Sequence, residues 1–354
     1  MLRYNKLKEL NLCDACLIVS SVNRFYFSGF NSSYGYVVHA DGKNYYLTDF
    51  RYGEEVRAFF ENQDVEVFSG SPAEVNALLQ NTLADEKIST IGYEDNRITC
   101  SQLSAFRKML PKKEFVPIGQ QLDRLRYKKD EYEVAQIEAA QHINDKAFTK
   151  LLDFIKPGMT EFEIKVELEY QLRQNGAEGL AFDTIVASGA NTSRPHSHVS
   201  RRKVAPGEFI ILDFGARYNG YCSDMTRTIA LGKPSQQMEE IYDSVLKAQA
   251  LALNALKAGA TAFEVYSLAK EYFTANGYGN EFLHGLGHSV GIEIHEEPFL
   301  NSEAQEALEN NMVLTVEPGL YLEKKFGVRI EDLVVIKEQG IKNLTASSKD
   351  LIIV

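Results

Sequence analysis

A repeat in the second half of the chain constrains its fold more than any other feature of the sequence. The segment Gly158-Met-Thr-Glu-Phe-Glu recurs 101 residues later as Gly259-Ala-Thr-Ala-Phe-Glu, and Asn175-Gly176 recurs at the same offset as Asn276-Gly277. Each copy opens with Thr-x-x-Glu, which predicts a helix N-terminus with a capping box, and closes with Asn-Gly, which suits a left-handed helix end. We therefore expect two structurally similar halves, related by a pseudo-two-fold.

The length and the pattern of the chain predict two domains. The chain has 354 residues, of which 44% are hydrophobic and 25% charged, as is ordinary for a globular protein with a large core. A charged stretch near 121–129 lacks strand pattern, and a long amphipathic helix pattern follows over 131–155. A similar long helix, near 236–257, precedes the second copy of the repeat. We place one domain at 1–122 and the other at 123–354.

The first domain alternates short apolar runs with helical patterns, which predicts an α/β domain with its own sheet. We expect strands over 15–19, 25–28, 34–39, 44–48, 65–68 and 90–93, and helices over 52–62, 72–83 and 100–110. Cys13-Asp-Ala-Cys16 is a CxxC, which suits either a redox pair or half of a zinc site. Because no second CxxC exists and an apolar strand follows, we favour a packing role for these cysteines.

Charge and cysteine usage exclude several classes of protein. The net charge of −11 and the pI near 5.3 argue against a nucleic-acid partner, which would need a basic surface. The N-terminus has no apolar core of a signal peptide, and no run approaches the length of a membrane span, so neither secretion nor membrane insertion is expected. Four cysteines are few for a secreted chain of this size, which indicates a reducing, cytoplasmic compartment.

Two aspartates flank a predicted hairpin turn at Asn219-Gly220, the strongest short signal for a two-residue type I′ turn. With that turn, residue 213 lies opposite Thr226 on the returning strand. Since side chains alternate along a strand, Asp213 and Asp224 share one face as diagonal neighbours, roughly 7 to 8 Å apart at the backbone. Their carboxylates can converge on one point.

The surroundings of these aspartates indicate a bound cation. Asp213 interrupts an otherwise buried strand, Phe-Ile-Ile-Leu-Asp-Phe-Gly, where a carboxylate without a counter-charge is costly. The repeat supplies two more carboxylates, because Glu317 aligns with Asp213 at an offset of 104 and Glu331 aligns with Asp224 at 107. Two facing halves would therefore bring four carboxylates together.

A glycine-rich run with three histidines, His284, His288 and His295, lies between the two pairs of carboxylates. Four carboxylates and one imidazole suit two divalent ions that share bridging ligands, and they exclude a closed thiolate zinc site. Two ions a few ångströms apart can hold a bridging hydroxide, polarise a carbonyl and stabilise a tetrahedral oxyanion. The implied reaction is hydrolysis. His196 corresponds by position in the repeat to His295.

This set of residues resembles the pita-bread metallopeptidases, the family of Xaa-Pro dipeptidase (prolidase), aminopeptidase P and methionine aminopeptidase. The resemblance covers the whole chain: the second domain is similar to the α+β pita-bread catalytic domain, and the first resembles the creatinase/prolidase N-terminal domain. It implies two divalent metal ions per subunit, manganese or cobalt with zinc as the alternative. The implied metal ligands are Asp213, Asp224, His288, Glu317 and Glu331.

The resemblance also implies roles for other residues. Glu317 would shuttle the proton of the attacking water as well as bind metal. His196 and His295 would line the pocket and steady the oxyanion and the scissile peptide. His284 and Arg329 resemble support residues, although Arg329 could equally form a simple ion pair on a strand face.

Within the family, the N-terminal domain favours the prolidase and aminopeptidase P branch, because methionine aminopeptidases resemble the catalytic half alone. Ser289 replaces a glycine that often follows the metal-binding histidine. Phe299 stands where some dipeptidases carry an arginine for the substrate carboxylate. The expected function is that of an Xaa-Pro dipeptidase in a cytoplasmic homodimer acting on small proline-containing peptides. The alternatives are an aminopeptidase P for longer peptides and a non-catalytic peptide-binding protein with this fold.

Overall fold

The computed structural model describes residues 2–354, which form two compact units. The division falls after Arg126, inside helix α6 (Gly119–Tyr127), which also contains the predicted boundary at 122/123. Each unit has its own hydrophobic core, so each is described by itself.

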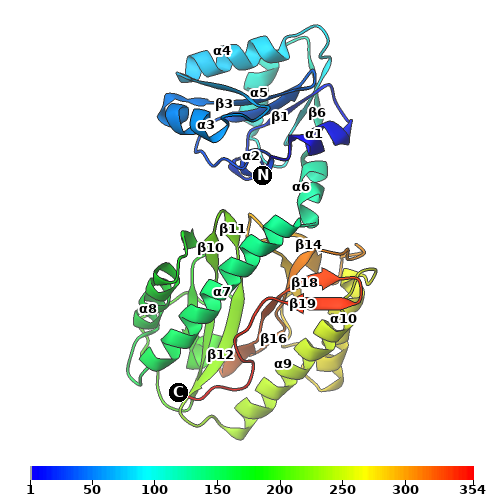
Figure 1. The fold of residues 1–354 in the computed structure, drawn as a ribbon. Helices are drawn as coiled ribbons and strands as arrows, with labels where there is room; N and C mark the ends of the chain where they lie inside the picture. The colour runs from blue at the N-terminus through cyan, green and yellow to red at the C-terminus, as the bar shows by residue number, and fades with distance from the viewer. Residues whose placement is uncertain (1) are drawn as a thin grey trace. The chain divides into compact units, whose positions relative to one another are not determined.

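The first unit is an α/β domain with a six-stranded mixed sheet in the order β4-β3-β2-β1-β5-β6 (Figure 1). Neighbours β1, β5 and β6 run parallel, as do β3 and β4, whereas β2 is antiparallel to both of its neighbours. Its strands are β1 Ala15–Ile18, β2 Tyr36–Ala40, β3 Lys43–Asp49, β4 Glu66–Gly70, β5 Thr90–Tyr93 and β6 Glu114–Pro117. Its helices are α1 Tyr4–Leu10, α2 Ser21–Ser28, η1 Phe50–Tyr52, α3 Gly53–Phe59, α4 Pro72–Leu83 and α5 Cys100–Met109. The predicted α/β class is confirmed.

The strand expected over 25–28 is wrong, because these residues belong to helix α2. The Ser20 side chain accepts a hydrogen bond from the Asn23 backbone N–H and caps the helix, and Gly29 ends it in a left-handed conformation with φ of 73°. An apolar run of four residues is too short to distinguish a strand from a buried turn of helix. The capping residues on either side, Ser20 and Gly29, are what indicate a helix here.

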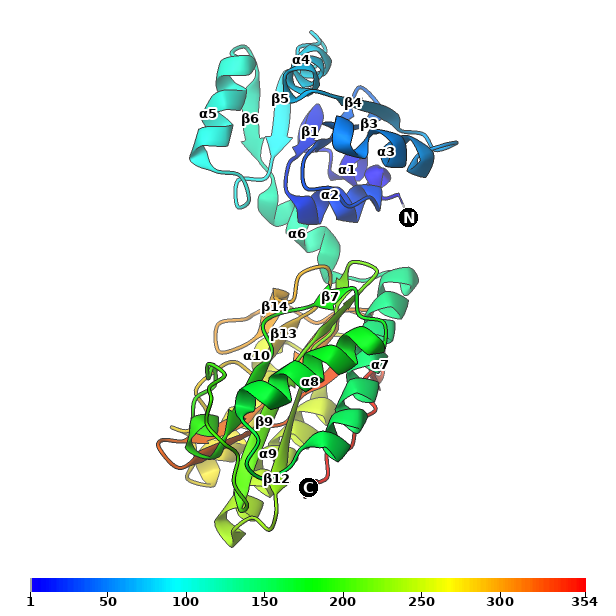
Figure 2. The ribbon, with the colours of Figure 1, turned by 90° about the vertical axis from the view of Figure 1, so that its left-hand side faces the viewer.

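The second unit contains two main sheets, each covered by a pair of helices (Figures 1 and 2). Helices α7 and α8 pack side by side on the sheet β12-β9-β8, and α9 and α10 cover the sheet β14-β13-β15-β18-β19. The helices are α7 Glu131–Phe154, α8 Glu161–Gln174, η2 Gly189–Ser193, α9 Gln236–Ala255 and α10 Ala262–Ala275. The two main sheets are built from β8 Ile185–Ser188, β9 Glu208–Phe214, β12 Met225–Leu231, β13 Gly287–Ser289, β14 Glu296–Leu300, β15 Val313–Val316, β18 Asp332–Lys337 and β19 Gly340–Asn343. Smaller sheets contain β7 Gly179–Leu180, β10 Ala216–Tyr218 and β11 Tyr221–Cys222, and β16 Gly319–Leu322 with β17 Phe326–Arg329.

The repeat predicted from the sequence is present in the backbone. Thr160 caps α8 and Thr261 caps α10, each with a complete capping box. Both helices end next to a glycine of positive φ, 108° at Gly176 and 82° at Gly277. The two halves of the unit therefore have matching helix pairs, and each pair supports a sheet that carries acidic residues.

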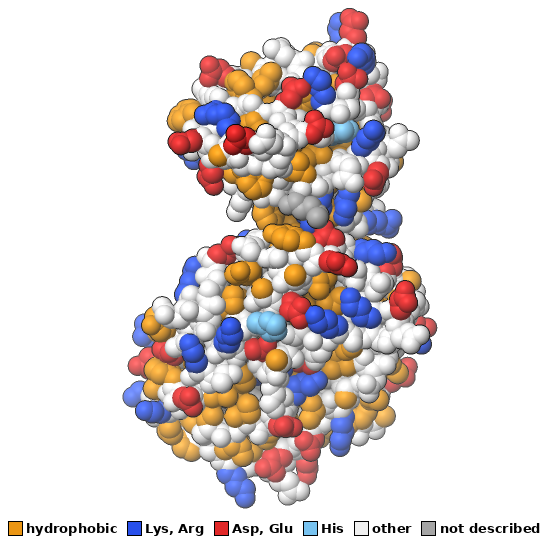
Figure 3. Space-filling view, in the orientation of Figure 1, with side chains coloured by type: hydrophobic (Ala, Val, Ile, Leu, Met, Phe, Trp, Pro, Cys, Tyr) orange, Lys and Arg blue, Asp and Glu red, His pale blue; other side chains and the backbone are white. Residues whose placement is uncertain are grey.

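None of the helices found in residues 2–354 combines the length and the apolarity needed to cross a bilayer. On the face drawn in Figure 3, acidic and basic side chains are interspersed, and neither sign gathers into a large patch.

Candidate metal centre

The hairpin at Asn219-Gly220 has the predicted register. Both turn residues have positive φ, 46° and 81°, as a type I′ turn requires. Tyr218 pairs with Tyr221 in the turn, and Asp213 pairs with Thr226 further along. The alternation of side chains then places Asp213 and Asp224 on one face, as the sequence predicts.

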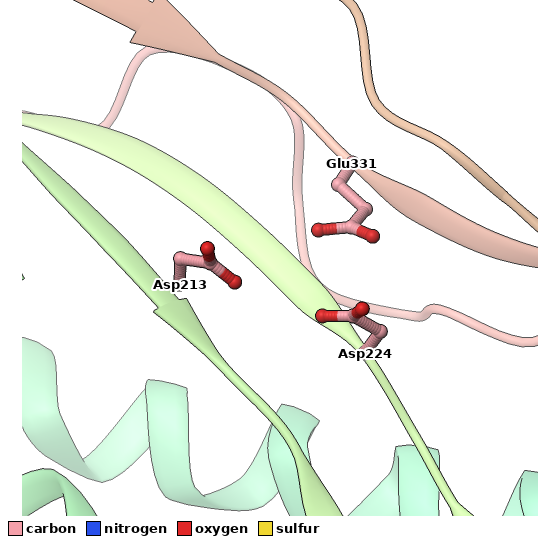
Figure 4. A group of neighbouring side chains, drawn as sticks. All are labelled: Asp213, Asp224 and Glu331. Carbon is pink, nitrogen blue, oxygen red and sulfur yellow. The ribbon is translucent and has the colours of Figure 1, made fainter. Parts of the chain in front are cut away.

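Three carboxylates from different elements meet in the second unit (Figure 4). Asp213 lies in β9, Asp224 directly precedes β12, and Glu331 directly precedes β18. One oxygen from each of the three groups lies within 4.8 Å of the others. Asp224 and Glu331 are 5% and 1% exposed, so water screens their charges poorly.

His288 and Glu317 complete the cluster. The Nε2 atom of His288 is 3.5 Å from Asp224 Oδ2 and 3.4 Å from Glu317 Oε1. Its Nδ1 lies 3.1 Å from the Ser289 carbonyl, to which an Nδ1–H donates. Nε2 is then unprotonated, and its lone pair faces two carboxylates. The preceding residue must be small, since a Cβ on Gly287 would lie 2.1 Å from the Thr315 carbonyl oxygen.

The unpartnered atoms of this cluster fit a divalent cation. Within residues 2–354, Asp224 Oδ1 and Glu331 Oε1 are buried without a hydrogen-bond partner. Burial raises the pKa of Asp224, and the charges of Glu331 and Asp213 raise it further. Burial of converging carboxylates and an imidazole lone pair costs free energy when no cation is present. Oxygen and nitrogen donors of this kind are the ligands that divalent metals bind.

Protonation states in the cluster lead to a prediction about metal binding. Burial raises the pKa of Glu317 to about 7 and lowers that of His288 to about 3. In the metal-free protein at about pH 6, carboxyl groups of the cluster therefore hold protons while His288 holds none. Because carboxylates bind metals in the ionised form, Mn²⁺ binding should release about one proton or more per chain. Near pH 9 the release should be smaller.

Calorimetric titration of metal-free protein with Mn²⁺ measures this release, because the observed enthalpy depends on the ionisation enthalpy of the buffer. The variant Glu317→Gln should release fewer protons. At about pH 6, an enthalpy that is the same in MES and Bis-Tris buffers would contradict the prediction.

Arg329 takes part in a buried hydrogen-bond chain and is not a simple surface ion pair. Its side chain is 4% exposed, and Nη2 donates to Asp213 Oδ2 at 2.6 Å. Its Nη1 lies 2.7 Å from Tyr321 Oη, which in turn lies 2.9 Å from His284 Nε2. Burial, followed by the charge of Arg329, lowers the pKa of His284 to about 4, so this histidine is neutral and can accept from Tyr321. Arg329 thereby orients Asp213.

All nine sequence-predicted site residues line one cavity of about 270 Å³. His196 and His295 lie exposed in its wall, and the ring of His295 is 4.5 Å from that of His288. The apolar part of the wall consists of Phe182, Ile185, Pro195, Ile294 and Phe299, of which the sequence interpretation singled out Phe299 alone. Nothing in their local pattern distinguishes these residues from ordinary core positions.

A buried ion pair shapes the turn that presents His295. Glu296 Oε1 accepts from the backbone N–H groups of Ile292 and Glu293, at 3.1 and 3.2 Å. Glu296 Oε2 lies 3.1 Å from Lys129 Nζ, and these side chains are 3% and 1% exposed. Gly291 leaves space for the Glu296 carboxylate, since a Cβ there would lie 2.6 Å from Oε2.

Family models match both units of the chain. Residues 135–338 match the model for metallopeptidase family M24, and residues 4–128 match the creatinase/prolidase N-terminal domain. The first match contains the five candidate ligands, and the second covers the six-stranded sheet.

Individual relatives span nearly the full chain. The chain is 38% identical to an Xaa-Pro dipeptidase of Pyrococcus furiosus, over 98% of this chain and 97% of the relative. The solved structure of an X-Pro aminopeptidase from Thermotoga maritima superposes with a TM-score of 0.93 at 39% identity, over 98% and 99% of the two chains. An Xaa-Pro dipeptidase structure from Bacillus anthracis gives 0.94 at 37% identity, over 99% of each chain.

Proposed function

Because the chain belongs to metallopeptidase family M24, we propose that it is an Xaa-Pro dipeptidase that uses two divalent metal ions per subunit. The proposed ligands are Asp213, Asp224, His288, Glu317 and Glu331, with manganese or cobalt preferred over zinc. The observation that carries the proposal is the buried cluster itself, in which two carboxylate oxygens have no partner among residues 2–354 and the His288 lone pair faces Asp224 and Glu317.

The residues of the cluster and those around it would have different roles in peptide hydrolysis. Bound divalent ions would supply Lewis-acid activation of a water molecule and of the scissile carbonyl. Glu317 would take a proton from the attacking water on its carboxylate and pass it to the leaving proline nitrogen, a role open to it because its side chain lines the cavity beside His288. His196 and His295, both in the cavity wall, would donate hydrogen bonds to the oxyanion and hold the substrate.

The shape and chemistry of the wall support proline as the residue after the scissile bond. Phe182, Ile185, Ile294 and Phe299 offer an apolar surface on which a pyrrolidine ring can be buried without loss of a hydrogen bond. Proline carries no N–H in a peptide bond, so this wall leaves no backbone donor of that residue unsatisfied.

One observation favours the alternative of an aminopeptidase for longer Xaa-Pro peptides. Among the described residues that line the cavity, Arg329 is the single lysine or arginine, and its guanidinium already bonds Asp213 and Tyr321. Phe299 lines the cavity, and by the family resemblance it stands where some dipeptidases carry an arginine for the substrate carboxylate. A substrate that continues beyond proline would not need that cation.

Hydrolysis of three peptides by metal-stripped protein, with Mn²⁺, Co²⁺ or Zn²⁺ added back, tests the proposal. We expect metal-dependent cleavage of an Xaa-Pro dipeptide and no cleavage of a Met-Ala peptide. Faster cleavage of an Xaa-Pro-Xaa tripeptide would assign the protein as an aminopeptidase P. No cleavage of any peptide, with metal bound, would indicate a peptide-binding protein on this fold.

We also propose, from the resemblance found in the sequence, that the protein is a cytoplasmic homodimer. Light scattering on the purified chain measures its mass in solution, and a monomer would contradict the proposal.

A further inference from the structure

The two cysteines of the CxxC segment are in direct contact in the first unit. The sulfur atoms of Cys13 and Cys16 are 3.5 Å apart and are not bonded to each other. Cys13 is partly exposed, whereas Cys16 lies in β1 and is 3% exposed. One thiol can therefore be reached from solvent, and the other lies behind it.

The turn between the cysteines is held by contacts that do not involve sulfur. The Asp14 carboxylate accepts from the backbone N–H groups of Ser89 and Thr90, both at 2.8 Å, and from the Thr90 hydroxyl at 3.0 Å. The Asp14 N–H donates to the same hydroxyl at 2.9 Å. On the other side, Gly92 makes room for the first sulfur, because a Cβ there would lie 2.5 Å from Cys13 Sγ.

The contact makes the two thiols chemically different. The hydrogen bond from the Cys16 thiol lowers the pKa of Cys13. The same contact with Cys13, and then burial, raises the pKa of Cys16. Attack on a disulfide requires a thiolate, so the accessible Cys13 is the better nucleophile. Once Cys13 is bonded to another sulfur, the contact that most disfavours the Cys16 thiolate is lost.

We propose that Cys13 and Cys16 form a redox site that is converted reversibly to a disulfide by low-molecular-weight disulfides. The Cys13 thiolate attacks one sulfur of the small disulfide, and one small thiolate leaves. Cys16 loses its proton to solvent and attacks Cys13 Sγ, which breaks the mixed disulfide and releases the second small thiolate. The protein gives up two electrons, and one small disulfide is reduced to two thiols.

The geometry favours reversible chemistry over a structural crosslink. The sulfurs must approach from 3.5 Å to about 2.05 Å, a movement that side-chain rotation can supply. A disulfide that closes so short a loop restrains the unfolded chain less than a crosslink between distant residues does, so it stabilises the fold less and resists reduction less. The packing role expected from the sequence stays a prediction, and it differs from the redox role in that it predicts no reaction of these cysteines with a small disulfide.

The full-length variant Cys100→Ser provides the test, because it removes the exposed cysteine and leaves Cys13, Cys16 and Cys222. The folded protein is treated with oxidised glutathione, quenched in acid, unfolded and alkylated, and its mass is measured before and after dithiothreitol. We expect alkylation of Cys222 alone, no retained glutathione, and full alkylation after reduction. Alkylation of all three cysteines after oxidation, or a stable glutathione adduct on Cys13 beside an alkylated Cys16, would overturn the proposal.

Two further variants test the roles of the residues. With Cys16→Ser, glutathione should remain on Cys13, because no second thiol can displace it. With Asp14→Ala, disulfide formation should slow by roughly tenfold, since the turn loses the contacts that hold the sulfurs together. An unchanged rate in Asp14→Ala would contradict the claim that the turn is pre-organised.

Discussion

The substitution Glu331→Gln is expected to abolish peptide hydrolysis and, at the same time, to stabilise the metal-free protein. Glu331 is fully buried, its Oε1 has no partner among residues 2–354, and burial together with the charge of Glu317 raises its pKa. Glutamine keeps the shape and can still accept the hydrogen bond that Thr226 donates to Oε2 at 2.7 Å. The amide stays neutral at every pH, whereas the raised pKa of Glu331 indicates that its ionised form is costly without a cation.

The two effects have separate magnitudes. Loss of a charged ligand at the reacting centre should lower kcat/KM by roughly 10²-fold or more. Replacement of the buried carboxyl group by a neutral amide, which can donate to the neighbouring carboxylates, should stabilise the metal-free protein by about 1–3 kcal/mol. Each kcal/mol corresponds to a rise in Tm of about 2–4 °C for a domain of this size. Repulsion among the remaining carboxylates also decreases, which acts in the same direction.

Thermal unfolding with and without Mn²⁺, together with turnover at saturating Mn²⁺, measures both effects. The matched control is Glu323→Gln, whose side chain is 86% exposed and which should change neither quantity. Intact turnover in Glu331→Gln with metal fully bound would disprove the two-metal proposal. A lower Tm for its metal-free form would show that repulsion does not govern this cluster.

The hairpin shows why part of the site could be predicted from the sequence. The relation of Asp213 to Asp224 depends only on a two-residue turn and on the alternation of side chains, both of which are local. The observed pairing of Asp213 with Thr226 agrees with that prediction. Glu317 and Glu331 could be predicted in another way, because in the sequence repeat they align with Asp213 and Asp224.

Residues that act through long-range contacts were not predictable. Tyr321 connects Arg329 to His284 through its hydroxyl group. In the sequence it lies in a short apolar strand, and no motif there indicates that the hydroxyl has a partner. Lys129 appears in the sequence as one member of a charged stretch, while its partners Ser289 and Glu296 are 160 and 167 residues away. Such pairs follow from the packing of the whole unit, which a single sequence does not reveal.

The buried Lys129 should be essential although it lies outside the metal cluster. Its Nζ donates to Ser289 Oγ at 2.9 Å and pairs with Glu296. In Lys129→Met, the buried Glu296 carboxylate would lose its ion pair with Lys129, a loss that typically costs about 3–5 kcal/mol. The carboxylate also holds the N–H groups of Ile292 and Glu293, so its displacement would move the turn that carries His295. We expect a large fall in kcat with the metal content retained.

Urea unfolding, turnover and metal analysis on matched variants separate this role from simple loss of the fold. Lys128→Met is the control, because Lys128 is 57% exposed and pairs only with the exposed Glu309 among its described ion-pair partners. Exposed pairs contribute about 0–1 kcal/mol, so stability and turnover should remain near the original values. In the double variant Lys129→Met/Glu296→Gln, the neutral side chain at position 296 should restore much of the stability, whereas turnover should stay low because the turn has lost its ion pair. If Lys129→Met alone unfolds at the original urea concentration, the ion pair does not hold this turn.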